Sequence, residues 1–411
     1  MITVVGAGTG APLPEDVAVG AELVVGGRRH LDAVRLPRRA RTVVLGALAP
    51  ALDTVAEYVA EERPVTVLAS GDPGFFGIVR ALAERFGPER LDVRPGVSSV
   101  AAAFARVGLP WDDAVVASAH GRDLGTAVHL CRAHPKVAVL TGPGAGPAEL
   151  GVALGSDGRV FVVASALGSA EERVERVTPA EAAVRDWGAA VSVVLCLDEA
   201  RALGPVRSVA GPRPGPAGWA LDEAEFAHRD SMITKFEVRA LALARLGPRP
   251  GDLVWDVGAG SGSVGVECAR LGAAVTAVEK TSDGVGRIRA NAAAHGVDVR
   301  VVHGAAPAVL SGLDEEPDAV FVGGGGRELP AIVAACARRA RRAVVVAMAA
   351  LDRVPAARRA LLDAGLDCDG VLLQSSRLAP LPGDVTRLAA SNPVFLLWGV
   401  RPHGRTEGVA P

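Results

Sequence analysis

The stretch Val254-Trp255-Asp256-Val257-Gly258-Ala259-Gly260-Ser261-Gly262-Ser263 decides the fold of the second half of the chain. An apolar run leads into three alternate glycines and then into a helical pattern, which is the strand–turn–helix order of a Rossmann-type domain. Glycines at such a turn permit unusual backbone angles and let a ligand approach the main chain closely. The next apolar run ends at Glu279, so a carboxylate is expected at the tip of the second strand, where it can bind ribose hydroxyls.

The ligand expected at this turn is S-adenosylmethionine (SAM) rather than a dinucleotide. Position 263 is Ser, where the dinucleotide fingerprint GxGxxG has Gly, and Asp256 precedes the glycines as in many methyltransferases. The candidate cofactor-binding residues are therefore Asp256, Gly258, Ala259, Gly260, Ser261, Gly262 and Glu279. A structural glycine turn in another Rossmann-like domain is the alternative.

Three further loops of the second half are candidates. Ala305 and Ala306 follow the third predicted strand, where loops commonly flank an adenine, and Gly323 and Gly324 follow the fourth, where they leave room for a large flat ligand. Ordinary turns would explain both loops as well. Upstream, Thr234 is expected to cap a helix over 235–245, in a capping box with Glu237.

The first half carries three glycine-containing loops, each expected at the carboxyl end of a strand. They are Gly6 to Pro12, Ser70-Gly71-Asp72-Pro73-Gly74-Phe75-Phe76-Gly77, and Pro95-Gly96-Val97-Ser98-Ser99. Pro12 and Pro14 prevent a helix from starting directly after the first loop, which disfavours a dinucleotide fold. We interpret the three loops as one ligand crevice, with Pro12, Gly71, Asp72, Pro73, Gly77, Ser98 and Ser99 as candidate cofactor-binding residues.

A Pro- and Gly-rich stretch at 204–218 divides the chain almost in half. Such a stretch cannot continue a helix or a central strand, so we expect domains at 1–203 and 222–401, a linker at 204–221 and a tail at 402–411. Strand-like and helix-like segments alternate in both halves, which predicts an α/β fold. In the second half the regular alternation predicts a doubly wound, mostly parallel sheet, with two antiparallel strands at its edge joined by a long loop.

The overall composition excludes several classes of function. The formal net charge is −2, which argues against a nucleic-acid or anionic-membrane partner held by bulk charge. The five cysteines form no CxxC pair and no metal-ligand spacing, so no metal is expected. No apolar run is long enough for a membrane span and the N-terminus has no signal-peptide pattern, so we expect a cytoplasmic protein without a membrane partner.

With these motifs in place, the first half resembles the tetrapyrrole methylase family, through Gly71-Asp72-Pro73 to Gly77, the loop to Pro12 and the 95–99 turn. The stretches 21–31 and 118–123 resemble its C5-methylating branch in cobalamin synthesis. The second half resembles the C15-methylating, decarboxylating partner, through 232–235, 255–262, 304–307, 323–325 and 391–395. The resemblance covers nearly the whole chain apart from the linker and tail.

The resemblance implies two SAM-dependent methylations and one decarboxylation of a precorrin, from precorrin-6B to precorrin-8X. It implies two α/β subdomains in the first half and adds Thr234 to the cofactor-binding candidates. Because the substrate carries many carboxylates, the substrate-binding candidates are Arg28, His30, His120, Arg122, Gly323 and Gly324. No catalytic residue is assigned, and we expect a homo-oligomer.

The chain departs from the family pattern at two positions, and two alternatives stay open. Ala305 stands where the family usually has an acid, and Thr9 stands where many members have Pro. The alternatives are a nicotinamide-dependent dehydrogenase, suggested by the two glycine loops, and a SAM-binding protein with only one active half.

Overall fold

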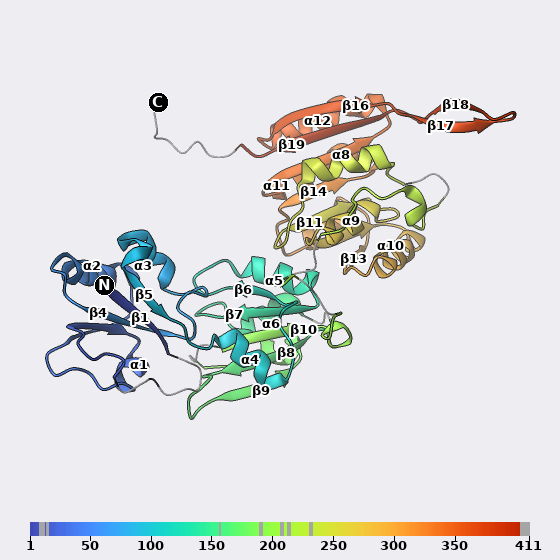
Figure 1. The fold of residues 1–411 in the computed structure, drawn as a ribbon. Coiled ribbons are helices and arrows are strands. Elements are labelled where there is room, and N and C mark those ends of the chain that lie inside the picture. The colour runs from blue at the N-terminus through green and yellow to red at the C-terminus, as the bar shows by residue number, and fades with distance from the viewer. Residues whose placement is uncertain are drawn as a thin grey trace, which may run out of the picture. The chain divides into compact units, whose positions relative to one another are not determined.

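The computed structural model describes residues 1–7, 13, 16–155, 158–188, 192–205, 209–211, 215–229 and 233–402. By its internal contacts the chain forms two compact units (Figure 1). Unit 1 comprises Met1–Leu124 and Pro135–Pro212, and unit 2 comprises Gly125–His134 and Arg213–Pro411.

Unit 1 begins with a parallel five-stranded sheet of order β3-β2-β4-β1-β5. Its strands are β1 (Ile2–Ala7), β2 (Leu23–Gly26), β3 (Arg41–Val44), β4 (Val65–Ser70) and β5 (Leu91–Arg94). Its helices are α1 (Arg28–Asp32), α2 (Leu48–Ala60), α3 (Val79–Phe86) and the 3-10 turn η1 (Pro88–Arg90). Buried residues line both faces of the sheet, with Val4 and Val67 packing toward α2 and α3, and Val5 and Leu68 packing on the other face. Burial on both faces explains why the central strands are nearly continuous apolar runs.

A second, mixed sheet of order β6-β7-β10-β8-β9 completes unit 1. Its strands are β6 (Val115–Ser118), β7 (Lys136–Leu140), β8 (Val160–Ser165), β9 (Arg173–Val177) and β10 (Ser192–Leu197). The helices here are α4 (Ser99–Val107), α6 (Pro147–Leu154), α7 (Pro179–Ala183) and the 3-10 turn η2 (Glu199–Arg201), while α5 (Leu124–Ala133), which follows β6 in the chain, belongs to unit 2 by its contacts from Gly125 on. Phe104 of α4 packs against Ala138, Val162 and Leu195 of this sheet. Two sheets with their own helices give unit 1 the two α/β subdomains that were expected.

Unit 2 is built on a seven-stranded sheet of order β13-β12-β11-β14-β15-β19-β16. Its strands are β11 (Leu253–Val257), β12 (Ala274–Glu279), β13 (Arg300–His303), β14 (Ala319–Val322), β15 (Ala343–Met348), β16 (Asp367–Leu373) and β19 (Val394–Val400). Its helices are α8 (Phe236–Leu246), α9 (Ser263–Arg270), α10 (Ser282–Ala294), α11 (Leu329–Arg339) and α12 (Val354–Asp363), with 3-10 turns η3 (Glu223–Glu225), η4 (Ala308–Gly312), η5 (Gly326–Glu328) and η6 (Leu351–Arg353). The first five strands are parallel, as predicted, and strand order reverses on either side of β11. Ligands bind at such a reversal point, outside the carboxyl ends of the strands.

Helices cover both faces of the unit 2 sheet. Val238 of α8 and Val264 of α9 pack on one face with Phe321, while Val333 of α11 and Leu361 of α12 pack on the other. The core of the unit therefore consists of two apolar layers that fix the carboxyl ends of β11, β12 and β14 relative to one another.

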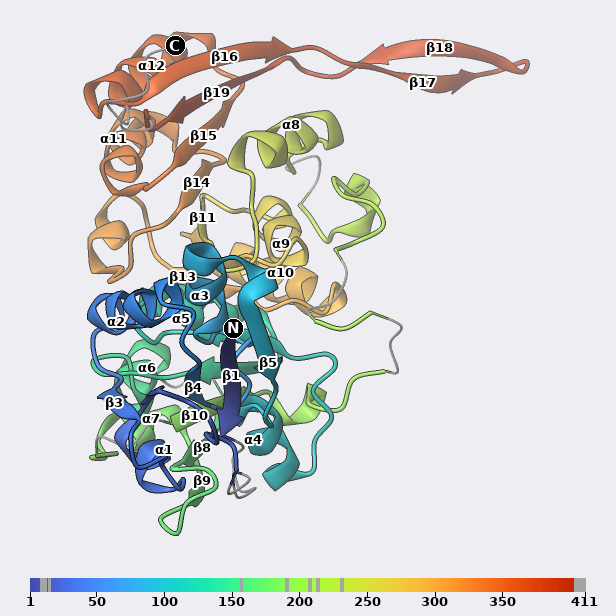
Figure 2. The same ribbon diagram turned by 60° about the vertical axis from the view of Figure 1, so that its left-hand side comes forward.

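The last two strands of the unit 2 sheet lie at its edge and pair antiparallel, as predicted: β19 lies between β15 and β16 and is antiparallel to both. The end of the unit differs from the prediction in one respect. The stretch expected to be a long loop contains a hairpin of β17 (Ser376–Leu381) and β18 (Val385–Ala390), which extends away from the main sheet (Figures 1 and 2). In β17 a proline and an alanine interrupt the apolar alternation, which hid the strand in the sequence.

Two absences concern the described residues alone. None of their helices is long and apolar enough to cross a membrane. Within the same ranges, no three His, Cys, Asp or Glu side chains gather as a metal site. The candidate Pro12 and positions 403–411 of the predicted tail lie outside the described residues.

Candidate functional site

The glycine turn after β11 adopts the backbone that the sequence predicted. Gly258, Gly260 and Gly262 have φ angles of +72°, +58° and +73°, a region that side chains with a Cβ rarely occupy. At Gly262 the restriction is also steric, because a Cβ there would lie 3.0 Å from the side chain of Ile288. The turn therefore needs glycine at alternate positions, and its backbone can lie close to a ligand.

Glu279 stands at the end of β12 and faces this turn. Its carboxylate accepts hydrogen bonds from Gly260 N (3.0 Å), Thr281 N (2.9 Å) and Thr281 Oγ1 (2.8 Å). Burial alone would raise the pKa of this carboxyl, but the bonds from Thr281 and Gly260 outweigh it and hold the pKa below its usual value. An ionised carboxylate thus lies at the strand tip, with lone pairs enough to accept further hydroxyl donors.

Asp256 lies beneath the same turn. It is buried, and its Oδ2 accepts a hydrogen bond from Gly265 N in the first turn of α9, at 2.9 Å. Burial raises the pKa of the Asp256 carboxyl to about 7, and the nearby charge of Glu279 adds to the effect. In this structure the side chain ties the turn to α9.

Two neighbouring pockets open at the carboxyl edge of the sheet and share Gly258, Gly260 and Gly323. The larger, of about 490 Å³, is also lined by the predicted residues Glu279, Ala305, Ala306 and Gly324. The smaller, of about 300 Å³, is also lined by the predicted residues Thr234, Asp256, Ala259 and Ser261. The structure thus brings together every second-half candidate except Gly262, which lines neither of these pockets.

Sequence reasoning missed several lining residues. Arg229, Lys280, Thr281 and Arg287 also border the larger pocket, and Lys235 borders the smaller one. Thr281 carried a signal, because it directly follows the acid at the strand tip and caps α10 through its bond from Gly284 N. Arg229 carried none, since it comes from the segment before α8.

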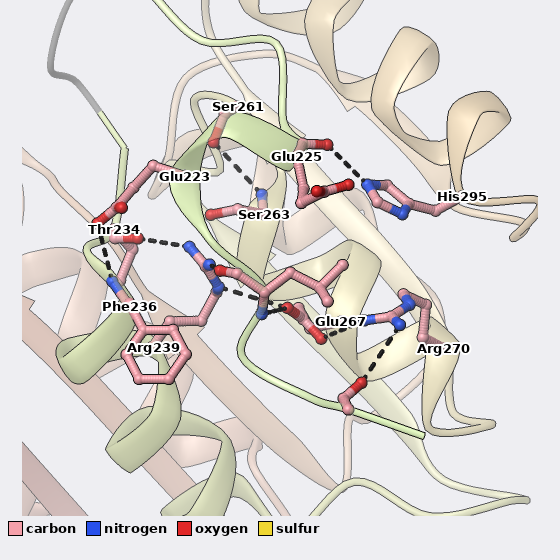
Figure 3. A network of polar contacts seen from close by, with 12 residues as sticks. Glu223, Glu225, Thr234, Phe236, Arg239, Ser261, Ser263, Glu267, Arg270 and His295 are labelled. Carbon is pink, nitrogen blue, oxygen red and sulfur yellow. Dashed lines mark hydrogen bonds and ion pairs between the residues drawn. The ribbon is translucent and has the colours of Figure 1, made fainter. Parts of the chain in front are cut away.

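The prediction that Thr234 caps α8 was wrong. The helix begins at Phe236, and its N-cap is Lys235, whose side chain makes no capping hydrogen bond. Glu237 pairs instead with Arg377 of β17 at 2.9 Å. Figure 3 shows that Glu223 supplies the acceptor for Phe236 N. The Arg377 guanidinium offers the Glu237 carboxylate two N–H donors, whereas a capping box would offer it a single backbone N–H.

In unit 1 the end of β1 and the two predicted loops after β4 and β5 meet at the carboxyl edge of the parallel sheet; of the first predicted loop only Gly6 and Ala7 are described. Gly71 N donates to Ala7 O at 2.8 Å, and a Cβ on Gly6 would lie 2.3 Å from Gly96 N and 2.4 Å from Gly71 O. Gly71 has a φ of +63° and packs against Ser98 and Ser99 N. The end of β1 and the loops after β4 and β5 therefore touch through their backbones, at a distance that glycine alone permits.

The remaining candidates of these loops have defined local roles. Asp72 Oδ1 accepts from Gly74 N at 2.8 Å, and Gly77 packs directly on the Pro73 carbonyl. The helix after this loop, α3, begins at Val79, two residues beyond Gly77. Ser98 caps α4 by accepting from Ala101 N at 3.1 Å, and Ser99 is the first residue of that helix.

A small polar cluster forms where α1 meets the end of β4. His30 Nε2 lies 2.7 Å from Ser70 Oγ, and Arg29 Nη2 donates to the same oxygen at 2.9 Å. Burial, and secondarily the charge of Arg29, lowers the pKa of His30, so its ring is neutral at pH 7. Sequence reasoning named His30 and the exposed Arg28 but missed Arg29 and Ser70, although Ser70 directly precedes the Gly71 loop.

The other two basic candidates follow β6. The Arg122 guanidinium lies 5.4 Å from the ring centroid of Phe76, in the Gly71–Gly77 loop. His120 is exposed, and its Nδ1 lies so close to Gly142 that a Cβ there would be 2.5 Å away. Arg122 thus contacts the Gly71–Gly77 loop, while among the described residues no contact links His120 to these loops.

Comparison with known proteins matches both units. The tetrapyrrole (corrin/porphyrin) methylase family model matches residues 1–183, and the precorrin methyltransferase domain model matches residues 224–399. A Sinorhizobium protein named precorrin-6Y C(5,15)-methyltransferase [decarboxylating] is 40% identical over 75% of this chain and 73% of its own length. The chain belongs to this family. Membership makes it a methyltransferase and excludes the dehydrogenase interpretation.

Relatives that are each named for a single methylation position also match parts of this chain. A Pyrobaculum calidifontis protein, a probable cobalt-precorrin-6B C(15)-methyltransferase (decarboxylating), is 40% identical over 40% of this chain and 87% of its own length. A Salmonella typhimurium cobalt-precorrin-7 C(5)-methyltransferase is 31% identical over 48% of this chain and all of its own length. Each relative is thus about as long as one unit.

Proposed function

We propose that the chain is a bifunctional enzyme of cobalamin biosynthesis that methylates a precorrin at C5 and at C15, using SAM, and removes an acetate carboxyl as CO2. The observation that carries this proposal is the pair of separate sites in one chain. Unit 2 has the glycine turn facing Glu279, and unit 1 has the junction of Gly6, Gly71 and Gly96. Two sites of different architecture suit two methyl transfers to one substrate.

We infer the division of labour and the order of reactions from the single-activity relatives. The C15 enzyme is named for cobalt-precorrin-6B and the C5 enzyme for cobalt-precorrin-7. Unit 2 is therefore proposed to act first, converting precorrin-6B to precorrin-7 with loss of CO2. Unit 1 would then methylate C5 to give precorrin-8X.

The residues of unit 2 fit SAM. Glu279 offers an ionised carboxylate to the ribose hydroxyls. Ala305 and Ala306 line the same larger pocket and are proposed to contact the adenine. The glycine turn lines both this pocket and the smaller one, which Thr234 also lines. In unit 1, the loops around Gly71, Asp72, Ser98 and Ser99 are the proposed holders. When bound, SAM supplies an electrophilic methyl group, whose transfer breaks a carbon–sulfur bond and forms a carbon–carbon bond.

The chain's own contribution to catalysis is alignment and electrostatics. Gly323 and Gly324 leave the space beside the glycine turn free of side chains, so a flat macrocycle can approach the donor pocket. In unit 1, Arg28, His30, Arg122 and the newly found Arg29 are proposed to bind substrate carboxylates, since arginine recognises carboxylates through paired N–H donors. His120 does not contact this cluster in the described residues, and we propose only that it contacts a carboxylate at the periphery of the same substrate.

We further propose that the protein acts in the cytoplasm as a homo-oligomer. All five cysteines are free thiols, as is usual in a reducing compartment. The β17–β18 hairpin exposes Leu378, Leu388 and Val385, and a two-stranded hairpin is marginally stable alone in water. Association with the same hairpin of a second copy would cover these side chains.

The deciding experiment supplies purified protein with precorrin-6B and SAM labelled with ¹³C in the methyl group. The expected result is two labelled methyl groups, assigned to C5 and C15 by NMR, and one CO2 per substrate. Precorrin-7 supplied alone should take up one methyl group and release no CO2. Transfer of a single methyl group from precorrin-6B would support a chain with one active half, and no transfer to either substrate would exclude the proposal.

A further inference from the structure

Arg239 of α8 is the centre of a buried polar network in unit 2 (Figure 3). Its side chain and that of Glu267 on α9 are both 0% exposed, and Arg239 Nε lies 3.6 Å from Glu267 Oε1. The guanidinium donates to the carbonyl oxygens of Thr234 (2.6 Å) and Leu221, and stands 4.8 Å from the ring centroid of Phe226. Arg270 pairs with the second oxygen of Glu267 at 2.8 Å.

The two carbonyls that Arg239 binds bracket the segment 221–235, which we call the front segment. Positions 230–232 of this segment lie outside the described residues. Arg229 of the front segment lines the larger pocket, and Ile233, Thr234 and Lys235 line the smaller one. One buried side chain therefore holds both ends of a segment that forms walls of both pockets.

Other contacts attach the middle of the front segment to the rest of unit 2. Asn291 exchanges two hydrogen bonds with Ala227 and donates a third to Ser261 O, in the glycine turn, at 2.8 Å. His295 Nε2 lies 2.9 Å from Glu225 O, and Glu267 Oε1 accepts from Leu221 N at 2.6 Å. The wall containing Thr234 and the turn containing Ser261 are thus fixed to one framework.

General energetics make a purely stabilising role for Arg239 a poor explanation. Removing a guanidinium and a carboxylate from water costs several kcal/mol, and apolar residues of similar size often stabilise a core as well as a buried ion pair does. An apolar residue could not bind two main-chain carbonyls in a fixed geometry. What Arg239 adds is therefore a defined position for the main chain at Leu221 and at Thr234.

We propose that Arg239 is a positioning residue for the methyl-donor site of unit 2: by binding the carbonyls of Leu221 and Thr234, it places Thr234 against the glycine turn. The proposal rests on the proposed function, because it assigns these pockets to SAM. Lysine cannot reproduce the arginine's planar fork, since it presents a single charged nitrogen. Arg239→Lys therefore keeps the buried charge but loses one of the two carbonyl contacts.

The test compares Arg239→Lys and Glu267→Gln with the matched control Arg245→Met. Arg245 lies on the same helix but is exposed, stacks on Trp398 and lines neither pocket. For Arg239→Lys we expect a 10- to 100-fold lower kcat/KM for SAM with precorrin-6B, because a small misplacement of a binding wall weakens alignment by such factors. With precorrin-7, where unit 1 acts, kinetics should match the wild type.

A binding measurement separates positioning from general damage. Calorimetric titration of the full chain with S-adenosylhomocysteine should show one weakened site in Arg239→Lys, the same site that Glu279→Gln weakens. Wild-type affinity and wild-type precorrin-6B kinetics in both Arg239→Lys and Glu267→Gln would overturn the inference. Equal losses in both methylations would do so as well, since they indicate misfolding. Failure of the wild type to methylate precorrin-6B would instead refute the proposed function.

Discussion

Glu279, at the tip of β12, accepts a hydrogen bond from the backbone N–H of Gly260, 3.0 Å away, at the turn that follows β11. The turn follows β11, which pairs in parallel with β12, so strand pairing places the two residues side by side. The carboxylate that is proposed to bind the ribose therefore also holds the turn that is proposed to approach SAM. A single substitution here should disturb both functions.

We predict that Glu279→Gln weakens SAM binding to unit 2 by about 10- to 100-fold, the value of a hydrogen bond to a charged group. The amide nitrogen of Gln would face N–H groups from which the carboxylate now accepts hydrogen bonds, and two donors cannot bond to each other. The measurement is calorimetric titration together with C15 methylation of precorrin-6B. Asp283→Asn is the control, because Asp283 is exposed in the first turn of α10 and lines neither pocket. Undiminished affinity in Glu279→Gln would remove Glu279 from the site.

The raised pKa of Asp256 predicts a pH-dependent stability. A carboxyl with an ordinary pKa of 3.8 and a folded-state pKa of about 7 binds its proton more tightly when folded. Its contribution is therefore fully favourable below pH 3.8 and is lost as the pH rises toward 7. Asn in its place can still accept from Gly265 N without ionising. The free energy of unfolding of SAM-free unit 2 should therefore be higher in Asp256→Asn than in the wild type at pH 8. This difference between variant and wild type should exceed the difference at pH 4 by about 2 to 4 kcal/mol.

Thermal unfolding of the ligand-free chain across this pH range checks the prediction. The relevant transition is the one that S-adenosylhomocysteine shifts in the wild type but not in Glu279→Gln. Parallel pH profiles for wild type and Asp256→Asn would show that Asp256 ionises normally.

The junction of Gly6, Gly71 and Gly96 in unit 1 predicts a steric effect. Gly6→Ala would place a methyl group 2.3 Å from Gly96 N, so the loops must separate, and we expect a destabilisation of about 1 to 3 kcal/mol. C5 methylation of precorrin-7 should fall while the C15 reaction is kept. Gly46→Ala is the matched control, since a Cβ there meets nothing within 4 Å. Equal stability of the two variants in chemical denaturation would contradict the close approach.

The cluster at the end of β4 predicts a substrate effect in the same unit. Arg29→Met should raise KM for precorrin-7 about tenfold, since it removes a donor for a substrate carboxylate and leaves Ser70 with one partner fewer. Arg85→Met is the control, because Arg85 of α3 pairs with Asp53 of α2 and not with the cluster at the end of β4. An unchanged KM for precorrin-7, measured with saturating SAM, would place the carboxylate contacts elsewhere.

These sites show what the sequence could and could not reveal. The glycine turn, Glu279 and the three unit 1 loops depend on neighbouring residues and on parallel strand order, so they were predictable. The position of the front segment depends on residue pairs that are far apart in the sequence. Arg377 binds Glu237, 140 positions away, and Arg239 of α8 pairs with Glu267 of α9. Local capping rules predicted Thr234 as the N-cap of α8 because they consider only neighbouring residues and not such distant partners. The family resemblance, which gave the fold and function, was confirmed.

The hairpin β17–β18 gives the last prediction. Leu378 and Leu388 face each other across its strands and are 79% and 67% exposed. Because exposed apolar pairs are unfavourable in water, we expect them to be covered by the hairpin of a second copy, so the wild type should have a mass above the 41.9 kDa of one chain. Leu378→Glu combined with Leu388→Glu should then give monomers, because four like charges would meet in a two-fold interface.

Light scattering after size-exclusion chromatography measures this mass directly. Leu351→Glu is the matched control, since Leu351 is similarly exposed, at 66%, but lies in η6, outside the hairpin. A charge at an exposed site that no partner covers changes little, so this variant should keep the wild-type mass. A monomeric wild type, or an unchanged mass in the double variant, would show that the hairpin does not join copies of the chain.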